Sequence, residues 1–160
     1  MRIVAAIAAA LIALAAPAQA MGPDPAPAAP AKPAASAPSK DFEDGKKAIN
    51  AAQYDKGIES LKKVVAAEPK NADAHNLIGF AYRKKGDLRS AAGYYDQALK
   101  IDANHKGALE YQGEMFLKLG RLDDAFKNRV RLREVCPETC PELRELDRAI
   151  ADFHKSAPKT

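Results

Sequence analysis

Short motifs that mark common enzyme classes are missing from this sequence. There is no Gly-rich phosphate loop, no G-x-S-x-G elbow and no H-E-x-x-H helix, the patterns that hold phosphates, a nucleophilic serine or a zinc ion. The three histidines are scattered, at His75, His105 and His154. We therefore expect that the protein is not an enzyme, needs no cofactor and has no metal site.

A strong excess of charge of one sign is missing as well. Residues 41–160 contain 22 basic and 20 acidic side chains, and the two signs alternate along the chain. A nucleic-acid-binding domain would instead gather its lysines and arginines into a basic patch or stripe. The alternation is typical of a solvated helical surface, so we expect no nucleic-acid partner.

No apolar run is long enough to span a membrane. The longest, from Ile3 to Ala16, falls short of the roughly 20 residues that a spanning helix needs. Arg2 precedes this run, and Ala18-Gln19-Ala20 is an A-x-A cleavage site, so residues 1–20 are predicted to be a signal peptide. No cysteine follows the site to accept a lipid. We expect a bacterial protein, periplasmic or secreted, with no membrane insertion after cleavage.

Residues 21–40 contain no aromatic or branched apolar side chain. They are mostly alanine and proline, and such a segment cannot bury enough surface to offset its conformational entropy. We interpret it as a disordered linker that precedes one small domain at 41–155. Residues 156–160 are expected to be a flexible tail.

Within the domain, small residues recur every 34 positions. Gly45, Gly79 and Gly113 follow this period. Each period divides into two amphipathic helices. In the second period, residues 72–105, Gly86 ends the first helix and Asp87 caps the next. Small side chains in both helices of a pair allow a close crossing, so the pattern predicts stacked helical hairpins.

This pattern resembles the tetratricopeptide repeat family over residues 38–139. The repeats would be 38–71, 72–105 and 106–139. The chain departs from the family at its early tryptophan, replaced by His75 and Leu109, and Arg129 stands where an aromatic residue is expected. The resemblance implies an all-α fold, with three hairpins stacked as a short right-handed solenoid.

Residues 140–154 are expected to form a C-terminal capping helix. Their apolar side chains form one stripe, from Leu143 to Phe153, that would cover the last hairpin. Thr139 and Glu142 have the spacing of a capping box, and Pro141 suits the first helical turn.

The family resemblance also implies a concave groove that binds a protein or peptide partner. Phenylalanine and leucine side chains would anchor apolar groups of that partner, and Lys46, Arg83 and Lys84 would bind its carboxylates. The groove positions carried over to this sequence are Phe42, Lys46, Ile49, Asn50, Asp73, Asn76, Phe80, Arg83, Lys84, Glu110, Glu114, Leu117 and Lys118.

The chain has two cysteines, Cys136 and Cys140, four positions apart around Pro137. An exported protein with an even cysteine count is expected to contain a disulfide, here one that fixes the corner before the capping helix. Two alternatives remain at this stage. Cys140 opens a helix, which favours the thiolate and redox chemistry, and two thiolates could contribute to a metal site.

Three functional hypotheses follow. The first is a non-catalytic exported adaptor or assembly factor that binds a protein segment in its groove. The second is a thiol function, redox or metal relay, at Cys136 and Cys140. The third is self-association through the first or last repeat.

Overall fold

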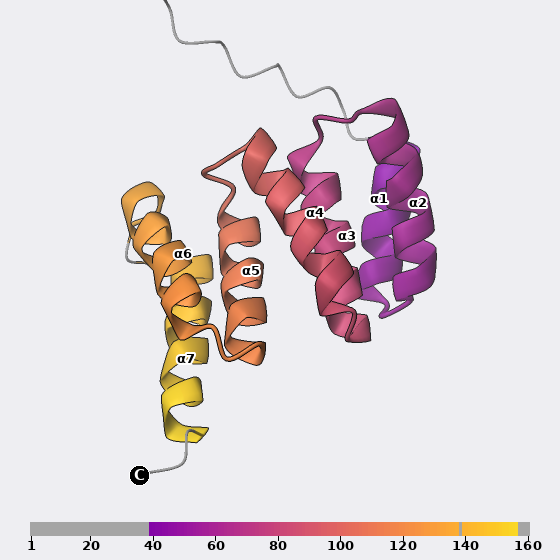
Figure 1. Cartoon of the computed structure of the whole chain (residues 1–160). Helices are drawn as coiled ribbons and strands as arrows, with labels where there is room; N and C mark the ends of the chain where they lie inside the picture. Colours follow the sequence, from indigo (N-terminus) through magenta and orange to yellow (C-terminus); the bar gives the residue numbers. More distant parts are fainter. Residues whose placement is uncertain (1–38, 138, 157–160) are drawn as a thin grey trace, which may run out of the picture. The chain divides into compact units, whose positions relative to one another are not determined.

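The structure, a computed structural model, describes residues 39–137 and 139–156. They belong to the second of the two units into which the chain divides, residues 35–160. The expected signal peptide, most of the linker and residues 157–160 lie outside the described residues. In order, the helices are α1 (Lys40–Asn50), α2 (Tyr54–Ala67), α3 (Ala72–Lys85), α4 (Leu88–Ile101), α5 (Lys106–Lys118), α6 (Leu122–Val135) and α7 (Pro141–Ser156) (Figure 1).

The all-α prediction is confirmed for the part of the chain that the structure describes. Every regular element in it is a helix. The first six helices form three antiparallel hairpins, α1–α2, α3–α4 and α5–α6, and α7 follows the third. No helix within residues 39–137 and 139–156 has the length and apolar character needed to cross a membrane.

The α3–α4 hairpin shows why the chain folds as its pattern predicts. Gly86 ends α3 with φ 87°, a left-handed conformation that glycine adopts without strain. The Asp87 side chain then accepts a hydrogen bond from the Ser90 amide at the start of α4. Where the helices cross, a Cβ atom on Gly79 would lie 2.8 Å from the Tyr95 ring and 3.3 Å from the Ala91 carbonyl oxygen. The close crossing at Gly79 is therefore confirmed.

The first helix begins slightly earlier than the sequence analysis expects. α1 starts at Lys40, inside the expected linker, because the Ser39 side chain accepts a hydrogen bond from the Phe42 amide. Serine at this position satisfies an amide that would otherwise have no partner. The linker therefore gives way to helix before residue 41.

The third hairpin differs from the first two at its centre. In those, the central glycine faces its own partner helix, as Gly45 faces Leu61. A Cβ atom on Gly113 would instead meet Leu146 of α7, at 2.7 Å. The residue equivalent to Leu61 is Arg129, which forms an ion pair with Asp147 of α7. Leu146 of α7 thus supplies the core side chain that α6 lacks at Arg129.

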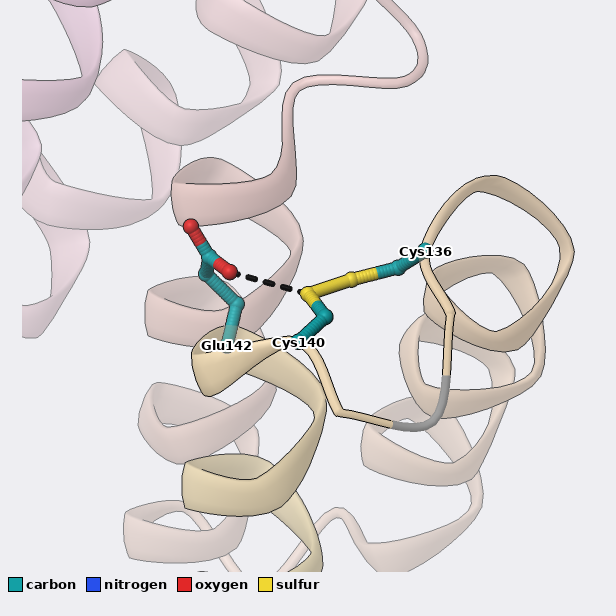
Figure 2. Close-up of side chains that lie close together, drawn as sticks. All are labelled: Cys136, Cys140 and Glu142. Carbon is teal, nitrogen blue, oxygen red and sulfur yellow. Dashed lines mark hydrogen bonds between the residues drawn. A yellow bond between two sulfur atoms is a disulfide. The ribbon is translucent and has the colours of Figure 1, made fainter.

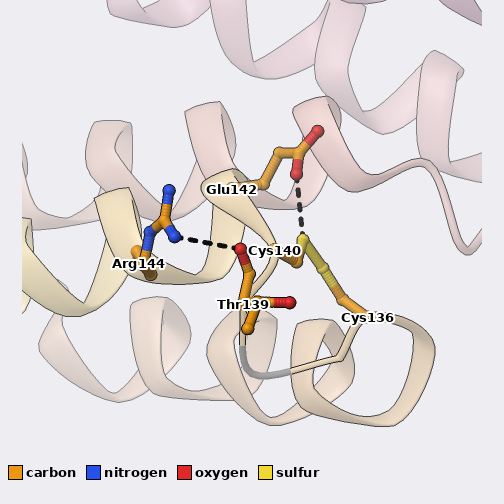
Figure 3. Close-up of a disulfide and its surroundings, with 5 residues drawn as sticks. All are labelled: Cys136, Thr139, Cys140, Glu142 and Arg144. Atoms are coloured by element: carbon orange, nitrogen blue, oxygen red, sulfur yellow. Dashed lines mark hydrogen bonds between the residues drawn. A yellow bond between two sulfur atoms is a disulfide. The ribbon is translucent and has the colours of Figure 1, made fainter.

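The corner between α6 and α7 corrects one detail of the prediction. The expected capping box at Thr139 does not form, because the helix begins at Pro141 and Thr139 lies before its N-cap position. The Thr139 carbonyl instead accepts a hydrogen bond from Arg144 at 3.1 Å (Figure 3). Glu142 lies near Cys140.

The hairpins stack in sequence, and the stack has two unequal sides. The odd-numbered helices contact one another, α1 with α3, α3 with α5 and α5 with α7. The even-numbered helices make no such contacts with one another in the described part of the chain. We use "inner wall" for the surface that the odd-numbered helices form, and "outer side" for that of the even-numbered helices.

Candidate functional site

The inner wall contains all the groove positions expected from sequence, since they fall on α1, α3 and α5. Their side chains differ in accessibility. Lys46, Lys84 and Lys118 are exposed, and Phe42 and Phe80 are partly buried. Five others are buried: Ile49, Asn76, Arg83, Glu110 and Leu117.

The centre of the wall is a cluster built around Arg83. Its side chain is only 4% exposed. The guanidinium carbon lies 5.4 Å from the centre of the Phe80 ring and 5.3 Å from that of Tyr111, and the two rings are 4.9 Å apart. Arg83 also forms an ion pair with Glu114 of α5. Cation–π contact and charge pairing together join α3 to α5.

This cluster corrects the role that the sequence analysis gives to Arg83. A buried guanidinium that is already paired with Glu114 is not available to bind a partner's carboxylate. The cations that remain accessible on the expected positions are Lys46, Lys84 and Lys118. Lys84 lies over the outer part of the cluster, 5.3 Å from the centre of the Phe80 ring.

The start of α5 is held against α3 by His105. Its Nδ1 accepts a hydrogen bond from the Ala108 amide, so the ring caps the helix. Its Nε2 donates to Asp73 of α3 at 2.9 Å. The two contacts fix the N-terminal end of α5. Glu110 lies a little more than one turn further along this helix.

Glu110 is the most perturbed acidic group of the wall. The residue is 7% exposed. Burial, followed by the nearby charges of Glu114 and Glu142, raises the pKa of Glu110 to about 8, although the charge of Arg83 acts in the opposite direction. The folded chain therefore keeps this carboxyl group mostly protonated near neutral pH.

Replacing Glu110 with glutamine is expected to remove a pH dependence of stability. Between about pH 4.5 and 8 the folded chain holds a proton that the unfolded chain has released, so wild-type stability falls as the pH rises through this window. The advantage of Glu110→Gln over wild type should grow by on the order of 2 kcal/mol across it, less than the full shift implies because the site is partly hydrated.

Urea unfolding followed by circular dichroism at a series of pH values measures this difference. The control is Glu134→Gln, which removes the same charge from an exposed position on α6. A constant difference between Glu110→Gln and wild type from pH 4.5 to 8.5 would contradict the raised pKa.

The two cysteines lie at the corner between α6 and α7. Their Cα atoms are 5.8 Å apart, within the usual range for a disulfide, and the structure joins their sulfur atoms. Figure 2 shows Glu142 beside them, with one carboxyl oxygen 2.9 Å from Cys140 Sγ. These two sulfurs and this oxygen all lie within 4.8 Å of one another. In the bridged form neither sulfur is a thiolate, so this form provides neither a nucleophile nor a thiolate ligand.

A shallow depression lies on the outer side. It lies along α6, where Phe126, Val130 and Arg131 are among its lining residues. Val130 is 53% exposed. All of its lining residues lie on α6, so it is one face of a single helix and not a cleft between elements. We therefore place the candidate site on the inner wall.

Sequence reasoning missed two contributors to that wall. Tyr111 completes the cluster around Arg83, and its position one turn before Glu114 on α5 could have shown that it shares this face. The sequence analysis considers Glu142 only as part of a capping box. Its position one turn before the buried Leu146 indicates that it also borders the packed face.

Comparisons with known proteins agree with this architecture. The sequence model described as "Tetratricopeptide repeat" matches residues 43–106 and 81–127. Among curated proteins, RNA polymerase II-associated protein 3 of Rattus norvegicus is 28% identical over 120 residues, which cover 73% of this chain and 18% of that protein. The chain spans less than a fifth of the length of the curated relatives it matches.

Solved structures show the same fold. The first TPR domain of Spaghetti (RPAP3), bound to the HSP90 peptide SRMEEVD, matches with a TM-score of 0.62 at 24% identity, covering 69% of this chain and 93% of that one. PcrH, in complex with the chaperone binding region of PopD, matches with a TM-score of 0.64 at 16% identity, covering 72% and 89%.

Proposed function

The chain belongs to the tetratricopeptide repeat family, and from this premise we propose that it is a non-catalytic adaptor that binds an extended segment of a partner protein along its inner wall. The adaptor acts outside the cytoplasm of a bacterium, where it helps to assemble or localise a complex. Both solved structures described above contain a peptide or protein region bound to a domain of the same fold.

The observation that carries this proposal is the combination of firm apolar contacts and free cations on one surface. Phe80 and Tyr111 are partly buried rings held in place by Arg83, so they offer apolar surface at little cost in side-chain entropy. Lys84 remains exposed beside the Phe80 ring. Lys46 is exposed on α1 of the same wall. Aromatic anchors surrounded by charged groups are typical of protein-binding surfaces.

Reversing the exposed charges of the wall tests the proposal. The double variant Lys46→Glu, Lys84→Glu is expected to lower capture of the partner from envelope extracts by at least about tenfold, since each charge-assisted contact contributes about 1.5–3 kcal/mol. Capture is measured by pull-down with the purified chain and quantitative mass spectrometry. Circular dichroism should show unchanged helicity, because both lysines are exposed.

The matched control reverses two lysines on the outer side, Lys56→Glu and Lys100→Glu, which are exposed on α2 and α4. It should capture the partner as wild type does. Equal loss in both double variants would show that net charge rather than the inner wall is responsible. If Cys136→Ser alone abolished function at an unchanged melting temperature, the thiol hypothesis would replace the adaptor.

Export and the disulfide are part of the same proposal. The sequence signals in residues 1–20 and the corner geometry of Cys136 and Cys140 support them. The intact mass of the protein from the envelope should correspond to a chain that begins at Met21 and is two hydrogens lighter than its reduced form. A chain that retains residues 1–20, or that reacts with an alkylating agent before reduction, would contradict the respective part.

A further inference from the structure

Glu110 is a buried acid that has no hydrogen-bond or ion-pair partner among the described residues. The residue is only 7% exposed. The fully enclosed side-chain polar atoms that lack a partner belong to His75, Asn76, Arg83 and Tyr95, not to Glu110. The carboxyl oxygens of Glu110 therefore reach the surface, and a ligand can contact them. Buried polar groups without a partner are rare in folded proteins.

The surroundings of Glu110 are acidic on the side towards α7. Figure 1 shows α5 and α7 side by side, running in the same direction. Gly113 of α5 meets Leu146 of α7, and one turn earlier on each helix lie Glu110 and Glu142. The charges of Glu142 and Glu145 both act on Glu110 and raise its pKa.

The other neighbours of Glu110 do not neutralise this end of the wall. On the side towards α3, Arg83 is the one cation among the groups that act most strongly on Glu110, and it is paired with Glu114. Tyr111 follows Glu110 on the same helix. Gln112 lies on the side of α5 that faces α4 and α6, because it forms hydrogen bonds with Asp96 and Asn128. These two helices therefore contact α5 on a different side from Glu110.

This arrangement selects the chemistry of a ligand. A carboxylate or phosphate would be repelled by the acidic side chains of α7, whereas a cation would favour the ionised form of Glu110, pair with it and gain from Glu142 as well. A metal ion fits less well, because the group of described residues with donor atoms close enough to share one contains Cys136, Cys140 and Glu142 but not Glu110. A charged side chain on a flexible stem reaches such a position without requiring several converging ligands.

We propose that Glu110 and Glu142 form a subsite that accepts the ammonium or guanidinium group of a lysine or arginine side chain in the bound segment. The inference rests on the proposed adaptor function. It also orients the segment along the wall, with a basic residue at the α5–α7 end and acidic residues towards Lys46 and Lys84 at the α1–α3 end.

Selection from a displayed library of random peptides tests the subsite on the purified chain. Peptides enriched by wild type should carry lysine or arginine at one fixed position of their consensus. Peptides enriched by Glu110→Gln, which replaces the acid with a group of the same shape, should lose this bias. Glu134→Gln, which removes the same charge from the outer side, should retain it.

The enriched peptide then gives a quantitative test. Replacing its basic residue with methionine should weaken binding to wild type by about tenfold and binding to Glu110→Gln by no more than about twofold, measured by calorimetry. Binding of the unmodified peptide to wild type should tighten between pH 6.5 and 8.5, since a cation pairs with the ionised acid. This dependence should be absent in Glu110→Gln.

The outcomes separate the subsite from the adaptor function. A consensus depends on the wall if wild type enriches it and the Lys46→Glu, Lys84→Glu variant does not. If such a consensus contains no basic residue, or if Glu110→Gln keeps the bias for one, the subsite is overturned and the adaptor function remains. If wild type enriches nothing that the double variant does not, both proposals are overturned.

Discussion

Replacing Gly79 with valine is expected to lower the free energy of unfolding by about 3 kcal/mol or more. Even a methyl group at this position would lie 2.8 Å from the ring of Tyr95 and 3.3 Å from the Ala91 carbonyl oxygen. Tyr95 has no exposed surface and cannot move aside, and the carbonyl belongs to the backbone of α4. The two helices of the hairpin must therefore separate, which also weakens the contact of α4 with α5.

The matched control is the same substitution at Gly93, in α4 of the same hairpin. A Cβ atom there would meet nothing within 4 Å, so Gly93→Val should leave stability unchanged or raise it by a few tenths of a kcal/mol through better helix propensity. Urea unfolding of both variants measures the difference. Equal stabilities would show that the hairpin tolerates a wider crossing than its packing implies.

Replacing Arg83 with methionine is expected to cost about 3 kcal/mol, in the range for loss of one partner of a buried ion pair. The substitution leaves Glu114 unpaired beside Glu110, and the rings of Phe80 and Tyr111 lose the cation packed against them. Arg83→Lys should recover little, because an ammonium group cannot lie flat on the rings while it pairs with Glu114.

A second variant separates charge from packing at this cluster. Arg83→Met combined with Glu114→Leu replaces both charged partners by apolar groups, and it should recover most of the stability that Arg83→Met loses. Thermal and urea unfolding of the three variants give the comparison. If the double variant is as unstable as Arg83→Met, the stabilisation comes from the arginine's contacts with the rings rather than from its ion pair.

Much of the fold is predictable from this sequence because it is local and repeated. Gly45 and Gly79 mark the helix crossings of the first two hairpins, and Gly86 with Asp87 marks a helix end and the next start. These signals depend on backbone geometry and on residues within one hairpin. These signals can therefore be recognised in the sequence without knowing which residues of the neighbouring hairpins they contact.

The parts that sequence reasoning misplaced depend on side chains from distant elements. Arg83 occupies a groove position, but the sequence gives no sign that Glu114, 31 residues later, neutralises it. Arg129 is recognisable as a departure from the repeat, yet only the packing shows that Leu146 takes its place. The raised pKa of Glu110 likewise arises from its burial and from acidic side chains on both α5 and α7.

The exchange of roles between Arg129 and Leu146 limits how this array can be lengthened. A further hairpin added after residue 135 would find no apolar residue at position 129, and it would displace the helix that fills the space above Gly113. Duplication before Lys106 meets no such obstacle, since the first two hairpins complete their own centres. Gene duplication or protein design that extends this chain is therefore confined to its N-terminal hairpins.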